Sequence, residues 1–241
     1  MQYNVIDNRK NSLRRYLPYL VGGILIVQFM GLGTWQASRG LQKRAELADF
    51  EVDSGYSSWY DGVDVQPFEQ LKVTGQFDAD HQLLLENIIV GGRNGYYVIT
   101  PFITAADAPV LLVNRGWLQK TQQDFDPGRI ALPAPRLTVR GRAGALPRAG
   151  IRMGEPVTPS PTWPKFAVYP VLEDVEVALG RPVQPFVLLL DPNDAHGYYR
   201  DWVPNAIGPG RHFGYALQWF GMAIVLALLL VWNYRNRGFE E

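Results

Sequence analysis

Three side chains that can bind or stack against a metal cofactor recur at helical spacing near the carboxyl end of the chain. His212, Tyr215 and Trp219 stand at positions i, i+3 and i+7, so in a helix they share one face. Arg211 adds a guanidinium, which pairs well with carboxylates. Two interpretations fit. These side chains can anchor a helix at the level of lipid headgroups, or His212 can be the axial ligand of a haem whose propionate pairs with Arg211.

Composition argues against several other kinds of site. The chain contains no Cys, which excludes disulfides, thiolate nucleophiles and Cys-based metal centres. Besides His212, the histidines are His81 and His196, which we interpret as exposed residues of loops, and no Gly-x-Ser-x-Gly or phosphate-binding loop occurs. We therefore expect no enzymatic activity. The 23 basic and 23 acidic side chains balance, so a nucleic-acid partner is not expected either.

Two long uncharged segments must position these residues. Residues 16–38 and 212–234 each lack Asp, Glu, Lys and Arg. A helix of that length spans about 34 Å, enough for a hydrocarbon core of about 30 Å. The sequence therefore predicts two transmembrane helices in a lipid bilayer. A cleaved signal peptide is the alternative for the first segment, but its apolar stretch is long and no small-x-small cleavage site follows it.

Basic residues before the first span predict the orientation. Arg9, Lys10, Arg14 and Arg15 favour a cytoplasmic amino terminus. Residues 1–15 and 235–241 are then cytoplasmic tails, and residues 39–211 form a domain on the opposite, periplasmic side.

The pattern within residues 39–211 predicts a mainly β domain. From Glu69 apolar side chains alternate with polar ones, as in a half-buried strand. Further strands are expected at residues 82–89, 96–103, 109–119, 136–143 and 183–190, and a helix at 170–179 that ends before Gly180. Asn114–Trp117 are interpreted as a turn at a strand end, and the proline-rich stretch 146–164 as a loop. The fold class is α+β, with two transmembrane helices flanking a β-rich domain that holds one or two helices.

Polar side chains within the spans need partners. Gln28 and Gln36 in the first span and Gln218 in the second are expected to hydrogen-bond between helices rather than to contact a ligand. Because the end of the first span and the start of the second lie at the same membrane face, residues 33–43 should pack near residues 211–219.

Several motifs together resemble one family. They are Gly33-x-Trp35-Gln36-x-x-Arg39-x-x-x-Lys43, Gly95-x-x-Val98-x-Thr100-Pro101-Phe102, Asn114-Arg115-Gly116-Trp117 and Gly208-Pro209-x-Arg211-His212-x-x-Tyr215-Ala216-x-Gln218-Trp219-Phe220. This set is similar to the Surfeit locus protein 1 family of cytochrome c oxidase assembly factors, over about residues 17–234.

The resemblance implies a function and a location. It implies two spans around a periplasmic or intermembrane-space domain, a role in maturing the oxidase core subunit, and haem a binding linked to His212 and Trp219. Haem a synthase is the second candidate partner. Since the amino terminus has no Arg/Ser-rich presequence, we expect a bacterial inner membrane. A scaffold that stabilises an assembly intermediate without haem is the alternative.

Overall fold

The computed structural model describes residues 4–51, 55–123, 125–132, 135–147, 155–202 and 208–237, with side chains from Tyr16 onward. It divides into two compact units. One joins the two ends of the chain, Met1–Glu51 and Val203–Glu241, and the other is the central Val52–Trp202. The predicted α+β class is confirmed, because two long apolar helices flank a mainly β domain with a small helix.

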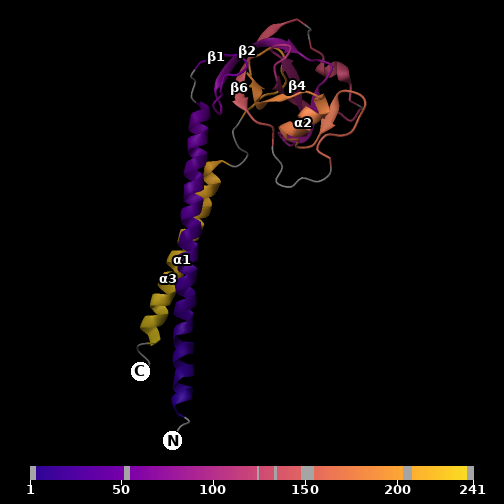
Figure 1. The fold of residues 1–241 in the computed structure, drawn as a ribbon. Helices are drawn as coiled ribbons and strands as arrows, with labels where there is room; N and C mark the ends of the chain where they lie inside the picture. The colour runs from indigo at the N-terminus through magenta and orange to yellow at the C-terminus, as the bar shows by residue number, and fades with distance from the viewer. Residues whose placement is uncertain are drawn as a thin grey trace. The chain divides into compact units, whose positions relative to one another are not determined.

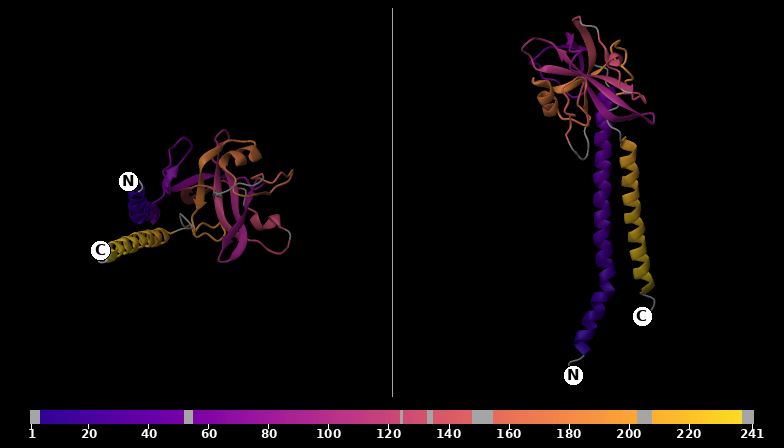
Figure 2. Two further views of the ribbon diagram at one scale, coloured as in Figure 1. Left: turned by 90° about the horizontal axis from the view of Figure 1, so that it is seen from below. Right: turned by 90° about the vertical axis from the view of Figure 1, so that its right-hand side faces the viewer.

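The first unit is a pair of antiparallel helices. α1 (Asn4–Glu51) and α3 (Pro209–Arg237) run side by side, with the start of α1 and the end of α3 at the same end of the pair (Figures 1 and 2). Both are long and apolar enough to cross a bilayer. α1 extends beyond both ends of the predicted span, so helix bounds do not locate the bilayer and the proposed span limits stay predictions.

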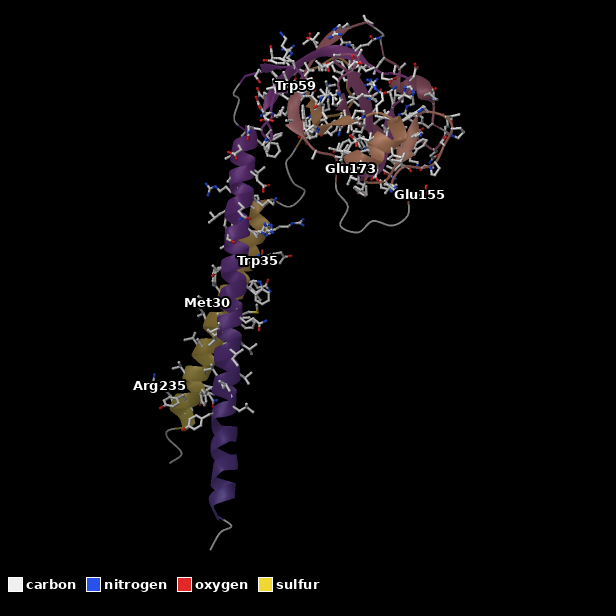
Figure 3. All side chains as sticks on the ribbon, in the orientation of Figure 1. Met30, Trp35, Trp59, Glu155, Glu173 and Arg235 are labelled. Carbon is white, nitrogen blue, oxygen red and sulfur yellow. The ribbon has the colours of Figure 1, made fainter. Side chains whose placement is uncertain are left out.

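Small residues line the contact between these helices. Gly33 and Gly40 of α1 are buried, as is Ala216 of α3. A Cβ atom on Gly33 would lie 2.6 Å from the ring of Phe220, and one on Gly40 would lie 2.8 Å from the ring of Phe213. The helices therefore pack with aromatic rings set directly over glycines, which larger residues would prevent. Met30 and Trp35 instead are exposed on the outer surface of α1 (Figure 3).

The second unit is built on a sheet of eight strands whose order is β1-β2-β6-β8-β5-β4-β3-β7. The sheet curls until β2 also pairs with β4, through Gln76 with Ile103 and Phe77 with Phe102, so five strands form a closed ring. The bounds are β1 Ser57–Trp59, β2 Gln70–Phe77, β3 Leu83–Val90, β4 Arg93–Ile103, β5 Val110–Gln119, β6 Leu137–Gly144, β7 Lys165–Ala167 and β8 Val183–Leu190.

Side chains along the central strands alternate in direction, and this alternation divides the hydrophobic core into separate clusters. On β5, Leu111 and Val113 pack into one cluster with residues of β2, β6 and β8. Val110 and Leu112 face a second cluster, which includes Val175 of α2 (Leu172–Leu179). β4 and β8 likewise contribute to both clusters, through Phe102 and Ile99 and through Leu188 and Val187, as the period of two requires. α2 is the orange helix labelled in the β domain of Figure 1.

The six predicted strands are confirmed as β2 to β6 and β8. β1 and β7 were not predicted, because three residues are too few to show a period. The predicted helix is present but begins at Leu172, since the backbone N–H of Val171 donates to Asp174 Oδ2 and starts the helix there. Gly180 ends it with a left-handed φ of 64°, as expected. Of the predicted loop 146–164, residues 148–154 lie outside the described residues.

The prediction of a strand-end turn at Asn114–Trp117 is wrong. β5 continues to Gln119, and these residues form a bulge within it, because Asn114 pairs with Ile99 while Trp117 pairs with Tyr97. Gly116 takes a φ of 104° at the bulge, and its N–H donates to Asn114 Oδ1. A turn-like sequence thus bends a continuing strand instead of ending it.

Candidate functional site

The predicted cofactor residue His212 is held by the other helix. Its Nδ1 lies 2.9 Å from Oε1 of Gln36. An amide oxygen can only accept, so the imidazole donates to it through Nδ1, and Nε2 is the ring nitrogen that this bond does not use. This contact confirms that Gln36 bonds between helices. Together with Phe213 against Gly40 and Phe220 against Gly33, it also confirms that residues 33–43 pack near 211–219.

Trp219 also contacts α1. Its ring centroid lies 5.6 Å from that of Phe29, with an interplanar angle of 36°. Both His212 and Trp219 are partly buried, whereas Arg211 and Tyr215 are exposed, Tyr215 to 54%. The predicted helix face therefore has an inner edge, formed by His212 and Trp219 at the contact with α1. Its outer edge, with Arg211 and Tyr215, is open to the surroundings.

An apolar groove continues from this contact along the helix pair. Its volume is about 570 Å³, and it is lined by Leu25 and Phe29 of α1 and by Gln218, Gly221, Met222, Val225, Leu226 and Leu229 of α3. Phe29 belongs both to the groove and to the contact with Trp219. Sequence reasoning missed the groove, because nearly every residue of a span is apolar and the pattern does not show which ones leave space between helices.

The available protein ligand is a single imidazole, which suits a metal whose other ligands come from a cofactor. Among the described residues, no three His, Asp or Glu side chains gather as a metal site. A single imidazole whose other nitrogen is fixed by a hydrogen bond is the usual protein ligand of a haem iron. His212 with Gln36 meets that requirement, and the adjoining aromatic and apolar surface suits a macrocycle.

The other two histidines lie in turns of the β domain. His81 Nδ1 is 2.8 Å from Asp78 Oδ2, and the imidazole stands edge-on to Trp163. The carbonyl of His196 accepts a hydrogen bond from Arg115 Nε at 2.8 Å. Each of these contacts fixes a turn.

Arg115, from the bulge of β5, is the most deeply buried arginine of the described chain, with 3% exposure. Besides His196 O, its guanidinium donates to Gln82 Oε1 at 2.9 Å and to Ile130 O at 3.1 Å. It also lies over the ring of Tyr198. Burial lowers the pKa of Arg115 from its ordinary value. These bonds join β5 to the 3₁₀ helix η1 (Pro127–Ile130) and to the loop after β8, a structural role that the bare motif did not reveal.

Comparison with known proteins identifies the family. The SURF1 family model matches residues 23–224, so the chain belongs to the SURF1 family. It is similar to SURF1-like proteins of Rickettsia felis, with 29% identity over 90% of this chain and 96% of the relative, and of Rickettsia conorii, with 28% identity over 92% and 91%. A SURF1-like protein of Monosiga brevicollis is 24% identical over 86% of this chain and 84% of the relative.

Membership defines the function at a coarse level. SURF1 proteins are cytochrome oxidase assembly factors, and the family is not a catalytic one. The two long apolar helices agree with membrane association. The chain is therefore a membrane-associated member of an oxidase assembly family.

Proposed function

We propose that this protein binds haem a through His212 in a bacterial inner membrane and assists its delivery to the core subunit of a haem-copper cytochrome c oxidase. The observation that carries the proposal is the hydrogen bond from His212 Nδ1 to Gln36 Oε1. It favours the tautomer in which Nε2 can coordinate iron, and it orients the ring from a neighbouring helix.

The remaining residues of the site have complementary tasks. Trp219 offers an indole face against which a macrocycle stacks, but its N–H is a donor and cannot ligate iron. Exposed Arg211 is available to pair with a propionate, and Tyr215, on the same face, offers a phenol at the outer edge. Haem supplies the iron that is carried, while the protein binds and orients it.

Delivery requires access to the oxidase subunit. We propose that residues 39–211 lie in the periplasm, because the basic residues before α1 favour cytoplasmic termini. The β domain then meets the core subunit, and a haem a synthase is the candidate source of haem. A reporter that is active only in the periplasm should be inactive when it is fused after Glu241. Activity of that fusion would contradict this orientation.

Absorption spectra test the haem proposal. The full chain is purified from cells that make haem a, as wild type and as His212→Ala, Trp219→Ala and Gln36→Leu. His212→Ala should change the haem spectrum or abolish binding, and Trp219→Ala should mainly lower retention. Gln36→Leu should lower the affinity by about 10- to 100-fold while keeping the ligand, as for other partners of metal-binding histidines.

Gln28→Leu is the matched control, because Gln28 is an exposed glutamine of the same helix. It should leave the affinity unchanged. If His212→Ala kept the wild-type haem content and spectrum, ligation by His212 would be wrong, and a scaffold that stabilises an assembly intermediate without haem would be the better account.

A further inference from the structure

We propose that the groove between α1 and α3 holds the isoprenoid tail of the bound haem, so that the protein selects prenylated over unprenylated haem. This inference rests on the proposed function, since it needs a macrocycle at His212. It assigns the tail-binding surface to groove residues of which Gln218 alone belongs to a motif of the chain.

The first argument is continuity. Trp219 contacts Phe29, and Phe29 is itself part of the groove wall. Along α3 the groove residues Met222 and Leu226 follow Trp219 at intervals of three and seven residues, so they share its flank. A chain that leaves the edge of a macrocycle beside Trp219 thus enters the groove without crossing a helix.

The second argument is extent. On α3 the groove lining runs from Gln218 to Leu229, which at about 1.5 Å per residue is from about 9 Å to about 26 Å along the helix from His212. A macrocycle ligated at His212 covers the near part of this distance. The groove therefore begins beside the ring and continues beyond it, over about three helical turns in all, which suits a long substituent of that ring.

The third argument is the chemistry of the lining. Gln218 is polar, while the other groove residues are apolar. Val225, Leu226 and Leu229 present branched methyl groups, and Met222 adapts to irregular shapes, so the surface matches a methyl-branched chain.

A lipid acyl chain is the competing occupant. Acyl chains can contact the apolar surface anywhere around the helix pair, so binding in this particular groove gives them little additional free energy. A tail tethered to a haem at His212 binds intramolecularly, at a high effective concentration. The groove should therefore increase the affinity for prenylated haem specifically.

The test compares two haems. Full-length protein in detergent micelles is titrated with haem a and with protohaem, which lacks the tail, and binding is followed by absorption. Wild type should bind haem a at least about tenfold more tightly than protohaem, since tethering adds the groove contacts. Leu226→Trp should fill the groove and remove most of this preference without changing the affinity for protohaem.

Leu228→Trp is the control, because Leu228 is 65% exposed and does not line the groove. It should keep the wild-type preference. Equal wild-type affinities for the two haems, or equal losses in Leu226→Trp and Leu228→Trp, would overturn the groove assignment while leaving His212-dependent haem binding in place. If neither haem bound, the proposed function would fail, and this inference with it.

Discussion

The contact between Gly33 and Phe220 makes a quantitative prediction about the helix pair. A Cβ at Gly33 would meet Cε1, Cδ1 and Cζ of Phe220 at 2.6, 2.8 and 2.9 Å, whereas a Cβ at Gly31 would meet nothing within 4 Å. Gly33→Val therefore forces the ring or the helices apart, and overpacking of this kind costs about 1–3 kcal/mol. Gly31→Val makes the same change of helix propensity in the same helix without a clash.

Separation of the helices can be measured directly, because the chain has no Cys. Tyr19 and Tyr234 are in ring contact with centroids 6.2 Å apart, so dyes attached through Tyr19→Cys and Tyr234→Cys report on the pair. SDS is added to full-length protein in mild detergent while energy transfer is recorded. The free energy of helix separation should be about 1–3 kcal/mol lower for Gly33→Val than for Gly31→Val.

The same change should reach the candidate site. Gln36 lies one turn from Gly33, so a displaced α1 weakens its hydrogen bond to His212, and haem retention should fall in Gly33→Val but not in Gly31→Val. If the two variants separated with equal free energies, within about 0.5 kcal/mol, the helices would not meet at Gly33 and the packing described above would be wrong.

Two further predictions concern the β domain. Arg115→Met removes the donor that His196 O uses and should lower the free energy of unfolding by about 1–3 kcal/mol. Urea unfolding followed by tryptophan fluorescence measures this, with Arg136→Met, at an exposed position, as a control that should change it little; equal losses would contradict the structural role. Burial, and then the hydrogen bond to the Asp191 carboxylate, raises the pKa of Tyr56 to about 12. Since the ordinary pKa is about 10, the stabilisation by Tyr56 is complete below pH 10 and lost as the pH rises toward 12, so the stability difference between wild type and Tyr56→Phe should shrink over that range. A difference independent of pH would refute this coupling.

The sequence by itself determined the elements whose signals are local. Uncharged length identified the two long helices, and alternation identified six strands, because burial of one face imposes a period that is visible in a single segment. Topology also placed residues 33–43 near 211–219, since two spans that enclose a domain must meet at the same membrane face. Gly180 could be assigned to a helix end because a left-handed residue there favours glycine.

The tertiary structure decided which segments and side chains meet. Closure of the ring through β2 and β4 depends on residues that do not neighbour each other in the chain, and Asn114–Trp117 form a bulge because β5 has partners on both sides. All three glutamines of the predicted spans satisfied the same sequence criterion, but Gln36 is the one that meets His212. The groove beside Trp219 was equally invisible, because hydrophobicity is uniform around a span. Which face carries a contact and which leaves a space depends on the shapes of the facing helix, and these become defined when the two helices pack.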